Sequence, residues 1–261
     1  MEFPKLDPNI DGVELKAECP ICAKSYTMNA NWNAREGHLC AACTASGRSQ
    51  AIAYMLSKYV FENDASLAKQ KKRNDIKVIG LSDGQVYARP LSKVCDYTNS
   101  FYHQEPYLDI TDPPEHYLNQ FDGLISADVF EHVFKHPCHA FRGANKILKP
   151  GGHLILTVPF VNQGDHKEHY LGMVGYESKE VNGKWVAEIE YANGYIERDE
   201  KPKFHGGPGK TLEVRLFNRK RLIEELQWAG FEDITIHDAN IPSSGINWSV
   251  ASRPITARKP F

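Results

Sequence analysis

The chain has 261 residues, enough for one large or two smaller domains with a proper core. Its formal net charge of −2 at pH 7 gives no general attraction to phosphate backbones, which disfavours a nucleic-acid partner. The N-terminus lacks the charged start and apolar run of a signal peptide, and no stretch of about 18 apolar residues occurs, so we expect a cytoplasmic protein without membrane contact.

Four cysteines in two pairs follow a polar N-terminal arm. Cys19 and Cys22 form one C-x-x-C, Cys40 and Cys43 form another, and 17 residues separate the two pairs. Paired knuckles at this spacing are typical of a zinc site, and closure by four thiolates makes such a site structural because no position is left for substrate. The alternatives are His38 in place of one thiolate, or four buried or redox cysteines. We expect a structural Zn2+ in a small zinc-ribbon-like module.

A helix is expected directly after the second pair of cysteines. Apolar residues recur at helical spacing in RSQAIAYMLSKYVFE, at Ile52, Met55, Leu56 and Tyr59. This stripe predicts a helix that docks the zinc module on the rest of the chain. The arm, the module and the docking helix are therefore placed in residues 1–60.

Residues 72–261 alternate short apolar runs with helical segments. IKVIGL, FDGLIS and HLILTVP read as buried strands, and DYTNSFYHQEPYLDITD holds two more that end near Asn99 and Asp109. VYARPLSKV, which Pro90 shortens or kinks, and KHPCHAFRGANKIL predict crossover helices. This alternation is typical of a parallel sheet whose ligands sit outside the carboxyl ends of the strands. The chemistry is therefore expected at residues 80–84 and their neighbours.

Residues 159–217 break this rhythm and are rich in Gly, Tyr and His. Within them, GKWVAEIEYANGYIE predicts a hairpin that turns at Asn193 and Gly194. A long insertion after the fifth strand is where we expect the substrate to be covered. Beyond it, Asn218 is expected to cap the helix RKRLIEELQWA, FEDITIH and NWSVASR to finish the sheet, and ITARKPF to form a tail.

These phrases together resemble the class I S-adenosylmethionine-dependent methyltransferases. The order VIGLSDG, LDITD, FDGLISADVFEHV, ILKPGGHLILTVP and a helix ending WAGF carries the resemblance, which covers roughly residues 72–253. The cysteine knuckles, the arginine-containing helix after them and the phrase FHGGP also resemble a bacterial subgroup that joins a zinc-binding module to this domain. The resemblance implies a Rossmann-like α/β fold: a seven-stranded, mostly parallel sheet with helices on both faces and an antiparallel last strand.

The resemblance also implies that S-adenosylmethionine binds at the first loop. The family's loop usually reads acid-x-G-x-G, whereas here Gly80 stands at the acid, Ser82 stands at the first loop glycine, and only Gly84 matches. Serine is the next smallest polar choice after glycine, so the backbone can still approach the ligand. Asp83 is then expected to hold the aminopropyl group in place of the missing acid.

Further cofactor contacts are implied at the following strand ends. Asn99 and Ser100 lie where the family's ribose-binding acid is expected, Asp109 fits the position that contacts adenine, and Ala127 and Asp128 fit the strand end facing the methionine moiety. Capping and local packing are the alternative for Asp128 and for the Glu-His pair of DVFEHV. The full set of expected cofactor-binding residues is Gly80, Leu81, Ser82, Asp83, Gly84, Asn99, Ser100, Asp109, Ile110, Ala127, Asp128 and His132.

Histidines of the insertion are the candidates for catalysis. A hydroxyl acceptor loses its proton near the transition state, and histidine has the ordinary pKa that best suits this task at neutral pH. The candidates are His166, His169 and His205, and Asp165 and Glu168 are placed to orient the first two. The alternatives are a divalent metal held by the cluster, which would acidify the acceptor, and a solvated polar loop.

The expected activity is methyl transfer from S-adenosylmethionine to an oxygen or nitrogen of a small molecule or saccharide. One alternative is an RNA methyltransferase whose zinc module grips RNA, since some rRNA guanine methyltransferases also carry an N-terminal four-cysteine site. The mildly acidic charge stands against it. The other alternative is a non-catalytic binding protein with a degenerate cofactor loop, because a fold alone does not confer activity.

Overall fold

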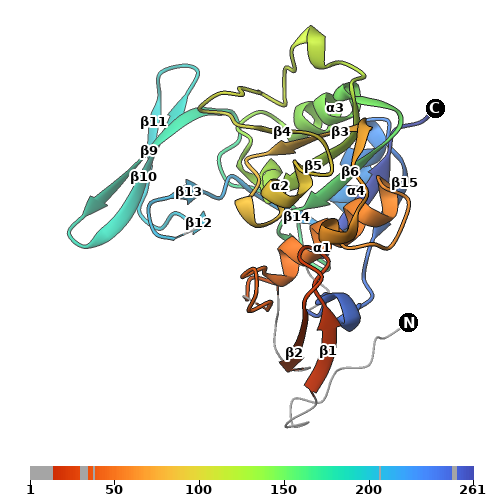
Figure 1. The fold of residues 1–261 in the computed structure, drawn as a ribbon. Helices are drawn as coiled ribbons and strands as arrows, with labels where there is room; N and C mark the ends of the chain where they lie inside the picture. Colours follow the sequence, from red (N-terminus) through yellow and green to blue (C-terminus); the bar gives the residue numbers. More distant parts are fainter. Residues whose placement is uncertain (1–13, 30–34, 38, 206, 249–251) are drawn as a thin grey trace.

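A central sheet with helices on both faces forms the body of the molecule (Figure 1). The computed structural model describes residues 14–29, 35–37, 39–205, 207–248 and 252–261. The sheet strands are β3 (Arg73–Leu81), β4 (Cys95–Ser100), β5 (Phe121–Ala127), β6 (Leu148–Thr157), β15 (Glu232–Ile236) and β16 (Ile255–Arg258). Their order is β15-β16-β6-β5-β3-β4, and β16 alone runs antiparallel to both of its neighbours among these described strands. The mostly parallel α/β class and the antiparallel last strand are confirmed.

The sheet separates two apolar cores because successive residues of a strand point to opposite faces. The helices are α1 (Gly47–Tyr59), α2 (Gln85–Leu91), α3 (Pro137–Ile147) and α4 (Arg219–Trp228), and the short 3-10 helices are η1 (Leu67–Lys69), η2 (Glu115–Tyr117), η3 (Phe130–His132) and η4 (Pro242–Ser244). Val78 and Ile125 pack with α1 and α2, whereas their chain neighbours Ile79 and Leu124 pack with α3 and α4. None of the helices in the described ranges combines the length and the apolar character that crossing a bilayer requires.

The strand expected to end near Asp109 does not form in the described part of the chain. An isolated parallel bridge between Phe101 and Tyr107 stands in its place, so the sheet has six strands rather than the implied seven. Pro106 has no N–H for a ladder, and Asp109 folds back to accept the N–H of Thr111 at 2.8 Å. The local turn chemistry therefore replaces strand pairing at this edge.

The last strand is also shifted along the chain. It consists of Ile255–Arg258, which the sequence analysis assigned to a tail, and not of NWSVASR. Ile255 and Ala257 are buried in the core under α3 and α4. Trp248 instead packs in the other core, with α1, and residues 249–251 of NWSVASR lie outside the described residues. Ile255–Arg258 pairs with β6 because its apolar side chains are buried on the sheet. The apolar content of a segment alone does not predict this pairing.

The N-terminal module packs on the sheet through α1. Its antiparallel hairpin consists of β1 (Glu14–Glu18) and β2 (Ser25–Asn29). Ser46 caps α1 by accepting the N–H of Ser49 at 3.2 Å, and Met55 from the expected stripe is fully buried. Cys19 belongs to the same buried cluster as Val78 of the sheet. The module and the sheet therefore share one continuous core, to which α1 contributes.

The long insertion forms small sheets of its own. Its strands are β7 (Phe160–Val161), β8 (Lys167–Glu168), β9 (Met173–Val181), β10 (Lys184–Tyr191), β11 (Ile196–Asp199), β12 (Phe204–His205), β13 (Thr211–Leu212) and β14 (Arg215–Asn218). An antiparallel meander of β9, β10 and β11 projects from the body (Figure 1), and it turns at Gly194 as expected. β14 pairs with β7 and β8 and leads to Asn218, which caps α4 by accepting the N–H of Arg221 at 2.7 Å.

Candidate functional site

The first loop connects β3 to α2 at the carboxyl edge of the sheet. β3 ends at the buried Leu81, and Ser82 follows with a left-handed backbone, φ +56°, a conformation that glycine adopts most easily. The Ser82 N–H donates to the carbonyl oxygen of Ser100 at 2.8 Å. A Cβ placed on Gly84 would meet nothing within 4 Å. The loop therefore leaves open space at Gly84, which suits the close approach of a cofactor.

The Asp83 carboxylate lies beside Gly80, the position of the missing acid of the loop. A Cβ on Gly80 would collide with the Asp83 carboxylate, so this carboxylate fills the space beside position 80. The hydroxyls of Tyr87 and Tyr97 donate to it at 2.8 and 2.7 Å. Burial raises the pKa of Asp83 to about 7, and the hydrogen bonds from the two tyrosines and the charge of Arg48 limit this rise. The sequence analysis missed both tyrosines, which lie outside the loop motif.

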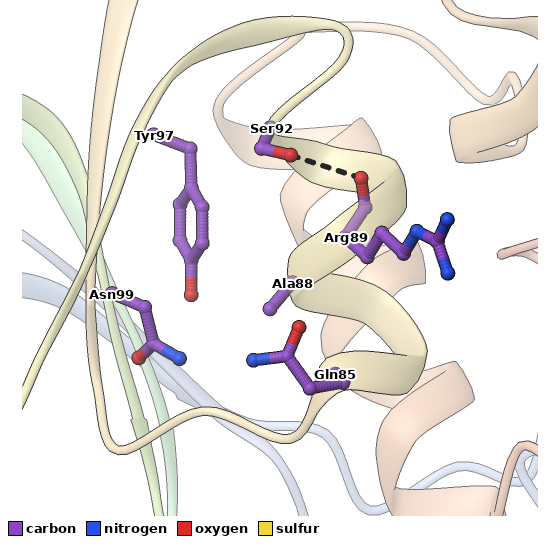
Figure 2. A pocket seen from close by; sticks show the side chains of 6 residues that line it. All are labelled: Gln85, Ala88, Arg89, Ser92, Tyr97 and Asn99. Atoms are coloured by element: carbon purple, nitrogen blue, oxygen red, sulfur yellow. Dashed lines mark hydrogen bonds between the residues drawn. The ribbon is translucent and has the colours of Figure 1, made fainter.

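Asn99 and Ser100 brace this loop. The Asn99 side chain accepts the N–H of Asp83 at 2.8 Å and donates to its carbonyl oxygen at 3.0 Å, and the Ser100 hydroxyl donates to the carbonyl oxygen of Gly80 at 2.8 Å. Figure 2 shows Tyr97 and Asn99 projecting from β4 toward α2, where they border a cavity of about 250 Å3. The cavity is lined by Gln85, Ala88, Arg89, Ser92, Tyr97 and Asn99. The expected ribose contact of Asn99 and Ser100 stays a prediction.

Asp109 and Ile110 lie in a turn against α3. Asp109 accepts the N–H and the hydroxyl of Thr111 at 2.8 and 2.7 Å, and Lys135 Nζ lies 3.7 Å from its other oxygen. Ile110 is buried, and a Cβ on Gly143 of α3 would collide with its carbonyl oxygen. The glycine thus lets α3 pack closely on this turn. Contact with adenine at Asp109 stays a prediction.

Asp128 is held by two arginines that the sequence analysis missed. It follows Ala127 at the carboxyl end of β5 with a left-handed backbone, φ +54°. Arg35 donates to its two carboxylate oxygens at 2.7 and 3.0 Å, Arg48 of α1 lies at 3.5 Å, and the Thr157 hydroxyl donates at 2.9 Å. Burial alone raises the pKa of Asp128, but the two arginines hold it below its ordinary value. The carboxylate is therefore ionised.

The carboxylates of Glu131 and Glu213 contact His132, which follows β5, and two histidines of the insertion. Glu213 accepts from His205 Nε2 at 2.9 Å and from His169 Nε2 at 3.1 Å. His205 Nδ1 lies 3.6 Å from an oxygen of Glu131, and the rings of His132 and His205 are 4.9 Å apart. The carboxylates of Glu131 and Glu213 raise the pKa of His205 to about 9, and burial raises the pKa of Glu131. We name these five residues the histidine cluster.

His166 lies apart from this cluster. Its Nε2 donates to Glu168 at 2.8 Å, Glu168 also accepts from Arg215 at 2.9 Å, and the His166 ring packs 5.5 Å from that of Phe217. Glu168 and Arg215 border a cavity of about 340 Å3, whose further lining residues are Phe134, Lys135, His136, His139, Leu171, Gly172 and Met173. The expected partner Glu168 thus orients His166, whereas His169 turns to Glu213.

The four cysteines form two matching knuckles. The sulfur atoms of Cys19 and Cys43 lie 3.7 Å apart, and those of Cys22 and Cys40 lie 3.5 Å apart. Thiolates about 2.3 Å from a tetrahedral zinc lie about 3.8 Å from one another. In each knuckle the residue after the second cysteine is left-handed and donates its N–H to the carbonyl oxygen of the first. Donor set and spacing fit a structural zinc, and His38 lies outside the described residues.

The fold is that of a class I S-adenosylmethionine-dependent methyltransferase. The sequence profile described as "Methyltransferase domain" matches residues 34–236, and the chain therefore belongs to this family. No curated protein sequence matches the chain.

Several solved structures are similar to the chain. A methyltransferase from Clostridium acetobutylicum ATCC 824 is 13% identical with a TM-score of 0.46, over 81% of this chain and 92% of that one. CalS10, an amino pentose methyltransferase from Micromonospora echinaspora, is 14% identical with a TM-score of 0.42, over 70% and 83%. The CMeT domain of the citrinin polyketide synthase is 13% identical with a TM-score of 0.40, over 71% of this chain. The match spans only 46% of that polyketide synthase chain.

Proposed function

We propose that this methyltransferase transfers the methyl group of S-adenosylmethionine to an oxygen or nitrogen of a small molecule or saccharide. One observation carries the proposal: Glu131 and His132 of the histidine cluster lie in η3, the first element after the carboxyl end of β5. The first loop ends at the same edge of the sheet, which is where parallel sheets bind their ligands. A proton acceptor is therefore available beside the expected cofactor site.

The first loop is the proposed cofactor site. Gly84 leaves room for the ligand, and Asp83 supplies a carboxylate for the amino group of the methionine moiety. Ala127 and Asp128 border the same region from β5. When bound there, S-adenosylmethionine supplies an electrophilic methyl group on its sulfonium centre. The role of the loop is to place that group in line with the acceptor atom.

A histidine that accepts a proton needs a neighbouring carboxylate to stabilise the positive charge. His205 lies between Glu131 and Glu213, and His166 lies against Glu168. We favour His205 as the base because it contacts the segment that follows β5. Its raised pKa of about 9 means that its proton-accepting form prevails only at alkaline pH, where we expect turnover to be highest. His166 is the second candidate, since Glu168 also borders the cavity beside the insertion.

Alanine variants of the two histidines test this assignment. His205→Ala or His166→Ala should lower turnover at least about a hundredfold, the usual scale for a general base. Calorimetric affinity for S-adenosylhomocysteine should stay unchanged, and His103→Ala, an exposed residue after β4, should retain full turnover. Methyl transfer from labelled cofactor to a panel of sugars, phenols and amines provides the readout.

Two results would count against the proposal in different ways. If neither histidine variant slows transfer to the true acceptor, the base assignment is wrong and catalysis depends on positioning alone. If the wild-type chain does not bind S-adenosylhomocysteine at about millimolar concentration, the proposed function as a whole is wrong.

We also propose that Cys19, Cys22, Cys40 and Cys43 hold one structural zinc. The matching knuckles and sulfur spacings support this proposal. A closed site of four thiolates leaves no coordination position for substrate, so the ion would shape the module rather than take part in methyl transfer.

A further inference from the structure

Three side chains of the histidine cluster converge on one point. Glu131 and His132 come from η3, directly after β5, and His205 comes from β12, far along the chain. An oxygen of Glu131 lies 3.6 Å from His132 Nε2 and 3.6 Å from His205 Nδ1. All three ligand atoms lie within 4.8 Å of one another. Ligands about 2.1 Å from a common ion are about 3.0 to 3.4 Å apart at octahedral or tetrahedral angles, so a small closure completes the site.

Glu131 has no other partner for its carboxylate among the described residues. Its side chain is 0% exposed, and neither oxygen accepts a hydrogen bond there. A buried carboxylate without a partner is costly, and buried charges are normally paired or bound to metal ions. Both nearby imidazole nitrogens lie beyond hydrogen-bond distance. The carboxylate therefore points at a position that a cation would satisfy.

The two histidines already present their free nitrogens to this position. His132 Nδ1 lies 2.8 Å from the carbonyl oxygen of Leu212, and His205 Nε2 lies 2.9 Å from Glu213. A carbonyl or carboxylate oxygen only accepts, so these nitrogens carry the hydrogen. A bound cation displaces the remaining ring proton of a ligand, which would leave the lone pairs on His132 Nε2 and His205 Nδ1, facing Glu131. Metal-binding histidines are typically oriented in this way by outer acceptors.

The backbone fixes the two segments against each other. Val214 donates its N–H to the carbonyl oxygen of Glu131 at 3.2 Å, and Arg215 donates to that of Phe130 at 2.8 Å. The insertion is therefore tied to η3 beside the ligands, by one backbone hydrogen bond and one from the Arg215 side chain. His205 remains 29% exposed, which leaves a path for an ion and for an acceptor.

We propose that Glu131, His132 and His205 bind one divalent transition-metal cation. Two imidazoles and one carboxylate suit manganese, iron, cobalt, nickel or zinc, and three protein ligands leave positions open for a substrate oxygen. Binding of the ion does not depend on the proposed function. The catalytic role of the ion does rest on the proposed function: a hydroxyl acceptor bound to the ion would lose its proton more easily. His205 would then act as a ligand, and the ion would take over the task assigned to the free base.

A manganese titration of the chain loaded with a single equivalent of zinc, which the four thiolates bind first, tests the proposal. Mn2+ prefers nitrogen and oxygen ligands, so it leaves a four-thiolate zinc site in place. The electron paramagnetic resonance signal of free Mn2+ should show one additional ion bound per chain, and Mn2+ should raise the melting temperature. Glu131→Gln and His205→Gln should each weaken binding at least about tenfold, and Glu213→Ala, which removes the outer acceptor, about ten- to a hundredfold.

His103→Gln is the matched control, because His103 is exposed and lies outside the cluster. It should bind Mn2+ like the wild-type chain. If Glu131→Gln fails to fold, His205→Gln decides, since its side chain is partly exposed. The proposal is overturned if the wild-type chain leaves Mn2+ free up to about 1 mM, or if the ligand variants bind as tightly as wild type. Mn2+ binding without binding of S-adenosylhomocysteine would leave the ion site standing and refute the proposed function.

Discussion

The carboxylate of Asp83 lies close to sequence position 80, although Asp83 itself is three residues further along the chain. Its carboxylate fills the volume beside Gly80, where the family's loop begins with an acid. Tyr87 of α2 and Tyr97 of β4 donate hydrogen bonds to this carboxylate and hold it in place. The location of the carboxylate is therefore determined by the residues that contact it and not by its place in the loop motif.

Asp83→Asn is expected to remove a pH dependence of stability. Burial raises the pKa of Asp83 from its ordinary 3.8 to about 7, so between these values the folded chain binds more protons than the unfolded chain. The stability gained from the neutral carboxyl is complete below about pH 4 and is lost as the pH rises through about 7. The loss is at most about 4 kcal/mol, since each pKa unit corresponds to about 1.4 kcal/mol.

Urea unfolding at about pH 5 and about pH 8 measures this loss. Between the two pH values the Asp83→Asn variant should lose about 2 kcal/mol less stability than the wild-type chain. Asp96→Asn, on the exposed side of β4, is the control and should follow the wild type. If the free energy of unfolding changes equally between the two pH values in the wild type and in Asp83→Asn, the Asp83 carboxyl does not titrate in this range.

Gly84→Val is expected to weaken cofactor binding and to leave the fold intact. A side chain at position 84 enters open space and the backbone there has an ordinary φ of −69°, so the variant should unfold like wild type. The branched side chain would occupy the volume that the cofactor needs. Calorimetry should show at least about tenfold weaker binding of S-adenosylhomocysteine, or about 1.4 kcal/mol.

Gly175→Val is a matched control on the projecting β9 strand, where a Cβ meets only ordinary contacts. It should bind S-adenosylhomocysteine like wild type. Unchanged affinity in Gly84→Val would place the cofactor elsewhere.

At the level of elements, the N-terminal module reaches the carboxyl edge of the sheet through its arginines. Arg35 lies between the two cysteine knuckles and Arg48 lies in the first turn of α1, and both contact Asp128 at the end of β5. Glu36 forms ion pairs with the same two arginines. The geometry of the knuckles therefore sets the position of charged groups beside the proposed cofactor site.

Cys40→Ser is expected to lose the zinc and to weaken cofactor binding. Metal binding and folding are coupled in structural zinc sites, so the module should unfold when one thiolate is removed. Arg35 would then no longer be held at Asp128. Metal analysis should show less than one zinc per chain, and affinity for S-adenosylhomocysteine should fall at least about tenfold.

Cys138→Ser serves as the control, because Cys138 lies at the start of α3, away from the knuckles. It should keep both zinc and affinity. A Cys40→Ser chain that retains full metal content and stability would contradict the zinc assignment.

At the scale of the whole molecule, the two apolar cores and the path of the insertion bring the residues of the histidine cluster together. The knuckles share a core with one face of the sheet, so the module is part of the body rather than an appended unit. The insertion leaves after β6, projects as a meander and returns through β14. Its return places His205 and Val214 against Glu131 of η3, the first element after β5. The histidine cluster thus exists only in the folded chain.

The sequence by itself determined the features that depend on neighbouring residues. Hydrophobic period and turn residues predicted the parallel strands, the helix capped by Asn218 and the turn at Gly194, and cysteine spacing predicted the knuckles. Each of these features is encoded within a short window. The backbone and side-chain preferences that produce them act before any distant contact forms.

Only the tertiary structure decided the features that depend on distant partners. The strand expected near Asp109 gave way to a local turn, and Ile255–Arg258 displaced NWSVASR because its side chains are buried on the sheet. Tyr97 on Asp83, the arginines on Asp128 and the glutamates around His205 come from other segments of the chain. Such pairings are set by which surfaces pack together, and no local pattern in the sequence specifies them.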